Sequence, residues 1–567
     1  MTKERTGFPS VDRPWLKYYN EAAINGSLPE CSIYEYLCEN NRDYPNDVAI
    51  IYLGKKITYR ELFENIERTA AAFVKAGVKE KEIVTVALPS IPEAVYCVYA
   101  LNKIGAVANM IHPLAGKEET VLYINEVRSK VVVVFDGAYN STSDIISKTT
   151  AEKVIVASPG DSLPITLRTL YFIKVHRPKL DGKIFSSWKE FIRLGKSTVV
   201  PRIEKDYNEL ALISHTGGTT GEPKGVMCSD YSLIACMLQI VCNFKFGRGG
   251  CSLMVLPPFV NYSIVEAAMA MLNIGYRVAM IPKYVPKEFP QYVRKYKPSV
   301  VLSIPAYWCA LLELKTKTDM SCLEHIYYGG EGMSEENEVE INRYLSECGV
   351  KVQLCKGLGC TEMVAGATQS YSTCNPIGSV GIPLVKTNCR IENPETDIEL
   401  SYNEQGEICF SGPSMMMGYY DNPDATDEII TTDKDGTRWL HTGDIGYIDV
   451  NGILYVTGRI KRIIMTKGRD GQVTKMFPDR IEKVICSIPE VELCCVIGVP
   501  DEARINYPKA FVVLKENDNA TLNVEKDIIN LCEEKLPEYM IPENIEFRSE
   551  LPRTARGKID YKALEER

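Results

Sequence analysis

Long apolar runs are missing from this 567-residue chain, and so is the apolar core of a secretion signal. A membrane-spanning helix needs about 20 predominantly apolar residues in succession. The first twenty residues are instead rich in charge, beginning with Lys3, Glu4 and Arg5. We therefore expect no membrane span and a cytoplasmic location.

An excess of basic residues is missing as well. The 65 Lys and Arg residues face 74 Asp and Glu residues, which gives a formal net charge of −9. Proteins that bind nucleic acid non-specifically need a positive surface, so no nucleic-acid partner is expected. The 19 cysteines form no C-x-x-C pair and the five histidines are scattered. Without zinc-ligand spacing, we interpret the thiols as reduced core residues of a cytosolic protein.

The chain is too long for one hydrophobic core, so two or more domains are expected. Continuous apolar segments at 83–88, 130–136 and 154–157 are typical of buried parallel strands. They alternate with helical patterns at 58–77 and 90–105. This alternation predicts an α/β fold, with layered α/β sheets in a large N-terminal domain that spans residues 1–460.

Two of these helices begin with capping-box spacing. Thr58 stands three residues before Glu61, and Ser90 stands three residues before Glu93, with Pro92 in the first turn. We expect both pairs to cap the helices that they precede.

The composition changes near Arg459. A strand is expected at 453–456, a break at Gly458-Arg459, a second strand at 463–465, and a loop at 468–478. The elements expected beyond are a helix from Pro478, strands at 491–499 and 510–514, and a helix at 524–536. We predict a small, mobile C-terminal α+β domain over residues 461–567, joined to the large domain at a hinge.

The segment 214–225 reads SHTGGTTGEPKG, with four glycines, three threonines and a lysine. An apolar strand pattern at 210–213 precedes it, and a helical pattern begins after it at Ser229-Asp230. Glycine lets backbone N–H groups approach an anion closely, threonine adds hydroxyl donors, and lysine adds a mobile positive charge. The segment is therefore predicted to bind phosphates. Its candidate ligands are Thr216, Gly217, Gly218, Thr219, Thr220, Gly221 and Lys224.

A Walker A loop would have Ser or Thr after its lysine, but here Gly225 follows Lys224. The order Thr-x-Gly-Thr-Thr-Gly-x-Pro-Lys-Gly instead resembles the signature loop of the adenylate-forming superfamily, which contains acyl-CoA synthetases, nonribosomal adenylation domains and luciferases. The alternative is a flexible surface loop.

Residues 357–362 (GLGCTE) resemble the second nucleotide motif of that superfamily. By this resemblance Thr361 would bind the α-phosphate and Glu362 would hold Mg²⁺, a cation that prefers oxygen ligands. Leu358 occupies the place of an aromatic residue that stacks on adenine. Gly357, Gly359 and Cys360 complete the motif. The turn 328–332 (YGGEG) resembles the adenine-contacting turn, with Gly330, Glu331 and Gly332 as candidates.

Residues 441–444 (HTGD) resemble the ribose motif, in which Asp444 would accept hydrogen bonds from the ribose hydroxyls. Arg459 would be the second ribose contact, while His441 is interpreted as structural. Residues 551–560 (LPRTARGKID) resemble the C-terminal lysine loop, in which Lys558 would bridge the substrate carboxylate and the α-phosphate.

The resemblance extends from about residue 30 to residue 565 and implies a two-step reaction. ATP and Mg²⁺ would activate a small-molecule carboxylic acid as an acyl-adenylate, and CoA would then take the acyl group. Catalysis would fall to Lys558, Thr361, Glu362 and Lys224.

The acyl pocket is expected at Val260, Asn261 and Tyr262, together with Gly330 and Gly359. Amino-acid adenylation domains carry aspartate at the place of Val260. We therefore expect the substrate to be an aliphatic or aromatic acid and not an α-amino acid.

The resemblance places the hinge at Lys461. CoA contacts are expected from the basic run 459–475, at Lys467, Arg469 and Lys475. One alternative is an adenylating enzyme that loads the phosphopantetheine arm of a carrier protein, and another is a non-catalytic nucleotide-binding protein. Monomer and homodimer remain equally open.

Overall fold

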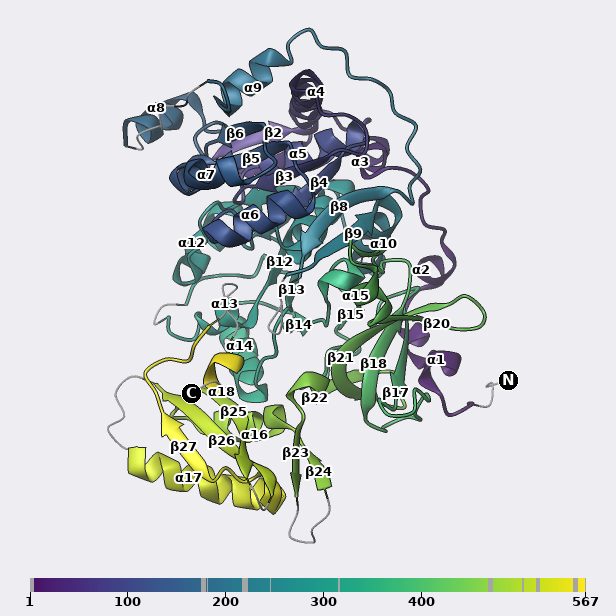
Figure 1. Cartoon of the computed structure of the whole chain (residues 1–567), viewed down its shortest axis with the longest axis vertical. Coiled ribbons are helices and arrows are strands. Elements are labelled where there is room, and N and C mark those ends of the chain that lie inside the picture. The colour runs from purple at the N-terminus through teal and green to yellow at the C-terminus, as the bar shows by residue number, and fades with distance from the viewer. Residues whose placement is uncertain are drawn as a thin grey trace.

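The computed structural model describes residues 5–174, 180, 182–216, 223–244, 246–314, 317–467, 473–501, 504–515, 521–553 and 559–565. A large upper body contains the N-terminal three quarters of the chain, and a smaller body below it contains the C-terminal part (Figure 1). This arrangement confirms the predicted α/β fold with a large N-terminal and a small C-terminal domain. The boundary at residue 460 stays a prediction.

The first sheet of the large body has eight strands in the order β19-β9-β8-β4-β3-β5-β6-β7. The strands are β3 (Ile83–Ala87), β4 (Val107–Met110), β5 (Val131–Phe135), β6 (Lys153–Ala157), β7 (Phe185–Ser187), β8 (Leu210–His215), β9 (Gly225–Ser229) and β19 (Gly418–Tyr419). Its centre is parallel, and β5 is buried at four of its five positions. Burial on both faces explains why this strand is continuously apolar.

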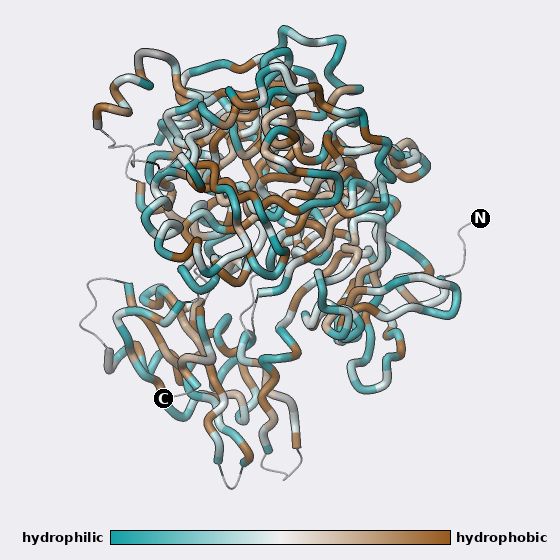
Figure 2. The backbone as a smooth tube through the Cα atoms, turned by 45° about the horizontal axis from the view of Figure 1, so that its top comes forward, coloured by the Kyte–Doolittle hydropathy of each residue, from teal (hydrophilic) through white to brown (hydrophobic). Residues whose placement is uncertain are grey.

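The second sheet has seven strands in the order β14-β13-β12-β10-β11-β1-β2. They are β1 (Val48–Tyr52), β2 (Lys55–Thr58), β10 (Cys251–Met254), β11 (Arg277–Met280), β12 (Val300–Ser303), β13 (His325–Tyr328) and β14 (Cys355–Lys356). The largest buried apolar cluster joins the two sheets through four elements between them. These are α4 (Tyr59–Ala76), α5 (Pro92–Lys103), α10 (Asp230–Val241) and the π-helix η4 (Tyr262–Ala270). Figure 2 shows hydrophobic segments gathered inside this body.

The other described α-helices, apart from α16 and α17 of the small body, are shorter or peripheral. They are α1 (Pro9–Asp12), α2 (Glu21–Asn25), α3 (Ile33–Asn41), α6 (Lys117–Glu126), α7 (Tyr139–Ile145), α8 (Ile165–Lys174), α9 (Trp188–Leu194), α11 (Met271–Asn273), α12 (Phe289–Tyr296), α13 (Pro305–Cys309), α14 (Glu335–Glu347), α15 (Pro423–Asp427) and α18 (Lys562–Glu565). Among the described residues, no helix is both long and apolar enough to span a bilayer.

Only one of the two predicted capping boxes forms. Thr58 and Glu61 cap α4 reciprocally, as predicted. The prediction for α5 was wrong, because its N-cap is Ile91 and no side chain caps it. Ser90 donates its hydroxyl hydrogen bond to the carbonyl of Leu256 (3.2 Å), and Glu93 accepts one from Ser162 (2.6 Å). Long-range contacts therefore take both side chains away from the helix terminus.

A third sheet is antiparallel and consists of β17 (Asn388–Glu392), β18 (Gly406–Ser411), β20 (Ile430–Thr432), β21 (Arg438–Ile448) and β22 (Leu454–Arg459). The predicted break at Gly458-Arg459 was wrong. Strand β22 continues through both residues because β21 pairs with them, Ile445 with Gly458 and Asp444 with Arg459. The chain turns instead at the 3₁₀ segment Ile460–Arg462.

The small body contains a three-stranded sheet of β25 (Val491–Asp501), β26 (Ile505–Leu514) and β27 (Asn544–Phe547). Helices α16 (Pro478–Cys486) and α17 (Thr521–Lys535) contribute to its separate apolar core. A hairpin of β23 (Ile464–Lys467) and β24 (Val473–Met476) connects it to the third sheet. The expected loop 468–478 is thus a strand over part of its length.

Candidate active site

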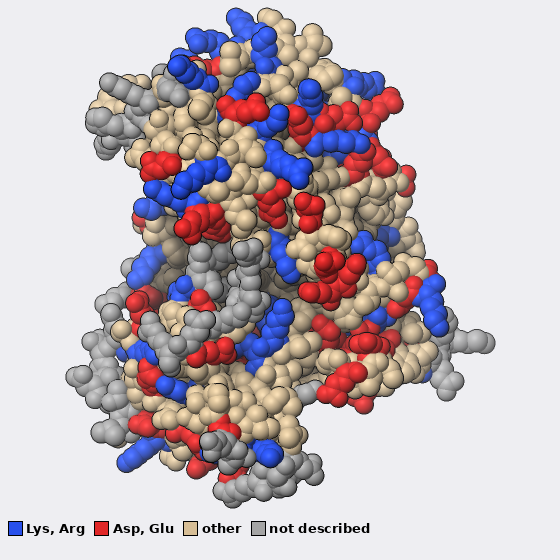
Figure 3. All heavy atoms as spheres, viewed as in Figure 1, with Lys and Arg blue, Asp and Glu red and all other residues tan. Residues whose placement is uncertain are grey.

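A cleft of about 3300 Å³ contains almost all the described residues of the predicted site. Figure 3 shows the molecule hollowed between the two bodies, with basic side chains beside the hollow. The predicted residues that line the cleft are Thr216, Lys224, Val260, Asn261, Tyr262, Gly330, Glu331, Gly332, Gly357, Leu358, Gly359, Cys360, Thr361, Glu362, Asp444, Arg459 and Lys461. Segments more than 200 residues apart therefore meet in one place.

The structure does not place every predicted residue in this group. Gly217, Gly218, Thr219, Thr220, Gly221, Arg469 and Lys558 lie outside the described residues, as does the side chain of Lys475. Lys467 lies on β23, away from the lining of the cleft, and its backbone N–H bonds to the carbonyl of Arg504 (2.9 Å). The CoA contacts expected of Lys467, Arg469 and Lys475 stay a prediction.

The two described ends of the 214–225 loop are held together. The backbone N–H of Thr216 donates to the carbonyl of Lys224, and the N–H of Lys224 donates to Thr216 Oγ1, each at 3.0 Å. The Lys224 ammonium lies 4.9 Å from the ring centroid of Tyr419. The Tyr419 hydroxyl in turn donates to Glu362 Oε1 at 2.6 Å. Burial and the nearby Glu362 carboxylate raise the pKa of Tyr419, so this hydroxyl remains a donor.

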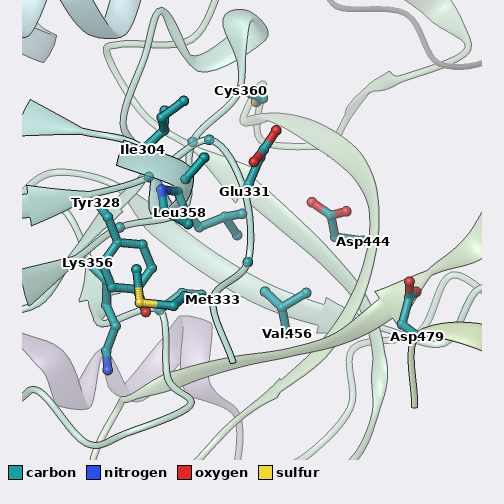
Figure 4. Close-up of a pocket in the computed structure, with 18 of the residues that line it drawn as sticks. Ile304, Tyr328, Glu331, Met333, Lys356, Leu358, Cys360, Asp444, Val456 and Asp479 are labelled. Carbon is teal, nitrogen blue, oxygen red and sulfur yellow. The ribbon is translucent and has the colours of Figure 1, made fainter. Parts of the chain in front are cut away.

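The GLGCTE segment forms one side of a tight antiparallel turn. Gly359 pairs with Gly366, and a Cβ atom on Gly359 would overlap the carbonyl oxygen of Ala365. Gly330 has a φ of 83°, a conformation that favours glycine. Figure 4 shows Leu358 and Tyr328 on one side of this space, and Asp444 and Asp479 on the other.

The two candidate ribose contacts already touch. Arg459 Nε lies 2.8 Å from Asp444 Oδ1, across the β21–β22 ladder. Nearby, His441 Nδ1 lies 3.1 Å from Glu407 Oε2, and Nε2 lies 2.9 Å from Thr431 Oγ1. The hydrogen bond with Glu407 raises the pKa of His441. This network agrees with the structural role expected of His441.

The predicted acyl wall is the half-buried segment that leads into η4, in which Asn261 is the buried residue. Asn261 Oδ1 accepts a hydrogen bond from the Ser214 hydroxyl (2.8 Å), which ties the wall to the end of β8. The Phe259 ring lies 4.5 Å from that of His112. Behind this turn the cavity continues between α10 and the second sheet. Its apolar lining there is Ile240, Phe244, Phe246, Met271, Val300 and Leu302.

The family model described as AMP-binding enzyme matches residues 37–420, about two thirds of the chain. The chain belongs to the AMP-binding enzyme family. A second model, described as AMP-binding enzyme C-terminal domain, matches residues 480–558. Membership confirms the adenylate-forming superfamily that the 214–225 loop indicated.

Relatives of this AMP-binding enzyme include acid–CoA ligases. A long-chain-fatty-acid–CoA ligase of Bacillus subtilis is 27% identical and covers 96% of each chain. A probable 4-coumarate–CoA ligase of Dictyostelium discoideum is 28% identical and covers 97% of each chain. The solved anthranilate CoA ligase AuaEII, in complex with anthranoyl-AMP, superposes with a TM-score of 0.80 at 22% identity, covering 96% of this chain and 98% of its own. The last similarity supports the fold.

Three side chains that line the cleft of this AMP-binding enzyme were not predicted from the sequence. Tyr419 links Lys224 to Glu362, and no motif in its neighbourhood points to it. Lys356, directly before the GLGCTE segment, is buried against Glu338. Glu266 lines the cavity from η4. A signal for Glu266 exists, because it is the lone charge in the apolar run 264–272.

The small body of the AMP-binding enzyme contacts the large one near the predicted hinge. Lys461 lies in the 3₁₀ turn, with its side chain on the cleft. The next residue, Arg462, bonds to Asp479 and to Glu482 Oε1 (2.6 Å) of α16. Between the bodies, Lys483 of α16 forms an ion pair with Glu335 of α14 at 2.6 Å. This exposed pair contributes little to stability, so separating its two side chains costs little free energy.

Proposed function

We propose that this protein is an acid–CoA ligase that activates a carboxylic acid with ATP and transfers the acyl group to CoA. The observation that carries the proposal is the convergence of the phosphate, ribose and acyl-wall candidates on one cleft. The names of the relatives support an acid–CoA ligase in general.

In the first step, an oxygen of the acid attacks the α-phosphorus of ATP. The bond between this phosphorus and the bridging oxygen breaks, and pyrophosphate leaves with its electron pair. Thr361 and Lys224 would bind the phosphates, and Asp444 and Arg459 would hold the ribose. Lys558, which lies outside the described residues, would neutralise the charge that develops at the reacting centre. Such fixed electrostatic stabilisation is usually the largest catalytic contribution.

A magnesium ion fits the donors around Glu362. Carboxylate oxygens are the ligands that this hard cation prefers. Glu362 Oε1 accepts the Tyr419 hydroxyl, so Oε2 is the oxygen available to a cation. When bound, Mg²⁺ would supply positive charge to the phosphate oxygens. Tyr419 would keep the carboxylate oriented.

The acid would occupy the cavity beyond Val260. Val260 cannot pair with an α-ammonium group, and most side chains of the wall behind it are apolar or aromatic. This lining favours an aliphatic or aromatic acid over an α-amino acid.

In the second step, the CoA sulfur attacks the acyl carbon, the carbon–oxygen bond to the phosphate breaks, and AMP leaves. The thiol proton passes to solvent. A small domain of residues 461–567 would rotate at Lys461 and withdraw the Lys558 loop from the path of the thiol. Breaking the exposed pair of Lys483 and Glu335 would accompany this rotation.

A screen of carboxylic acids tests the proposal. Pyrophosphate release is measured with ATP and Mg²⁺ over aliphatic, aromatic and α-amino acids, and mass spectrometry then follows thioester formation with CoA or with a phosphopantetheinylated carrier protein. We expect an acid-dependent signal and a CoA thioester, both lost in Lys558→Ala. A thioester on the carrier protein alone would favour the carrier-loading enzyme. No acid-dependent pyrophosphate release would refute the proposal.

A further inference from the structure

Glu266 is an acid buried in the wall of the acyl cavity. It lies in the middle of η4, and 5% of its surface is exposed. Its neighbours in the sequence, Val265 and Ala267, belong to the apolar core. A π-helix is rare and often marks a functional site. An ionisable side chain in such a place needs an explanation, because burial of a charge is costly.

Among the described residues, hydrogen bonds reach one of the two carboxyl oxygens of Glu266. Glu266 Oε1 accepts a hydrogen bond from the backbone N–H of Gly366 at 2.9 Å, and the thiol of Cys236 lies 3.9 Å from the same oxygen. No described group bonds to Oε2. Since Glu266 is part of the cavity lining, Oε2 is the oxygen left for a molecule in the cavity.

No basic side chain of the described chain forms an ion pair with Glu266. Burial without a counter-charge raises the pKa of Glu266 to about 8. The carboxyl is therefore mostly protonated at neutral pH. A protonated carboxyl can donate a hydrogen bond through Oε2 while Oε1 keeps its bond to Gly366.

The carboxyl lies between the acyl wall and the nucleotide segment. Tyr262 precedes Glu266 by four residues, about one helical turn, so both face the cavity from one side of η4. A Cβ atom on Gly329, in the adenine-contacting turn, would lie 3.7 Å from the Tyr262 ring. On the other side, Gly366 pairs with Gly359 of the GLGCTE segment. Glu266 therefore lines the cavity between the acyl wall and the GLGCTE segment.

We propose that Glu266 is a specificity-determining residue that selects carboxylic acids bearing a hydroxyl group on the acyl part. The inference rests on the proposed ligase function. A hydroxyl group can accept a hydrogen bond from Oε2 and donate one in return. An unsubstituted acyl group would strip water from Oε2 and leave it without a partner, which is unfavourable. Sites that hydrogen-bond a substrate hydroxyl reject the analogue that lacks it.

A purely structural role is the competing explanation. Glu266 would then serve only to bond the N–H of Gly366. Two variants separate the explanations. Glu266→Gln keeps an oxygen acceptor for Gly366 and an N–H donor toward the cavity, but it cannot titrate. Glu266→Leu removes both polar functions at similar volume.

The experiment measures kcat/KM of pyrophosphate release with matched acids. A hydroxyl is placed at successive positions along an aliphatic chain or around an aromatic ring, and each acid is paired with its unsubstituted and amino counterparts. For the best hydroxylated acid, we expect a preference of roughly 10- to 100-fold over the unsubstituted acid. Because the pKa of Glu266 is raised to about 8, kcat/KM of the wild type should decline above about pH 8. Glu266→Gln should keep most of the preference and lose this decline. Glu266→Leu should abolish or invert the preference.

Each contrary result has a distinct meaning. If no acid releases pyrophosphate, the ligase function fails, and this inference fails with it. If acids are activated but wild type does not prefer any hydroxylated acid, the inference alone is wrong. A preference for the amino counterpart would also overturn it. The Glu266→Leu variant could also keep the wild-type ratio of kcat/KM for hydroxylated over unsubstituted acid while unfolding at a temperature near that of wild type. Glu266 would then have only the structural role of bonding the N–H of Gly366.

Discussion

Breaking the buried pair of Lys356 and Glu338 should damage both stability and the nucleotide segment. Lys356 is 1% exposed and Glu338 is 2% exposed, and the ammonium bonds directly to Glu338 Oε1. The Tyr328 hydroxyl donates to the other carboxylate oxygen at 3.2 Å. Figure 4 shows Lys356 and Tyr328 together at the edge of the cavity. Lys356 ends β14, and the GLGCTE segment begins at the next residue.

The size of the effect follows from the burial. Lys356→Met leaves the Glu338 carboxylate buried with the Tyr328 hydroxyl as its remaining partner, and such a loss typically costs about 3–5 kcal/mol. Glu338→Leu leaves the ammonium uncompensated at a similar cost. Replacing both residues removes both charges, and an apolar pair is often close to neutral. The two costs should therefore be strongly non-additive.

Calorimetry on the wild type, both single variants and the double variant tests this reasoning. In a large domain the single substitutions should lower the melting temperature by roughly 5–10 °C, and the double variant should recover most of the loss. The rate of adenylation at 25 °C should follow the same order, because Lys356 directly precedes Gly357 of the GLGCTE segment. Single variants that melt like wild type would refute the argument. So would a double variant whose loss equals the sum of the two.

Four further predictions concern other residues. Lys558→Ala should slow adenylate formation by about 10²–10³ while sparing thioester formation from a supplied acyl-adenylate, and equal losses in both half-reactions would contradict this role. Glu362→Ala should raise the Mg²⁺ concentration needed for half-maximal pyrophosphate release, and an unchanged titration would make Glu362 structural. Lys461→Pro, which fixes φ, should preserve adenylation but cut thioester formation by orders of magnitude in a protein with normal thermal unfolding, and two intact half-reactions would exclude this hinge. Burial raises the pKa of Glu93 to about 7, so wild-type stability to urea should fall as pH rises from about 4.5 through 7, and Glu93→Gln should remove that slope.

Local patterns predicted elements well where the neighbours in the sequence decide the structure. The run at Val131–Phe135 is apolar throughout because a parallel strand covered on both faces admits little else. The capping box of Thr58 and Glu61 joins two residues only 3 positions apart in the sequence. Neither prediction needed knowledge of the rest of the fold.

The same patterns failed where a distant partner competes. Ser90 and Glu93 have the spacing of Thr58 and Glu61, but Glu93 bonds with Ser162, which is 69 residues away. Gly458 and Arg459 read as a break by composition. They remain in a strand because β21 supplies the partners that hold them there. The competing contacts have no trace in the local sequence.

The residues of the candidate site fall into the same two groups, those that local motifs predict and those that depend on distant partners. Groups that would touch a nucleotide occur in short contiguous motifs, because a backbone that must bend around phosphates needs several permissive residues in succession. The side chains that support them reach across the fold instead. Tyr419 bonds to Glu362 from 57 residues away, and Gly366 bonds to Glu266 from 100 residues away. A single sequence therefore reveals the candidate ligand-facing residues first. The supporting residues can be identified only from the structure, in which the sheets bring their partners together. Glu266 is an exception, because an isolated acid in an apolar run can be recognised from the sequence alone.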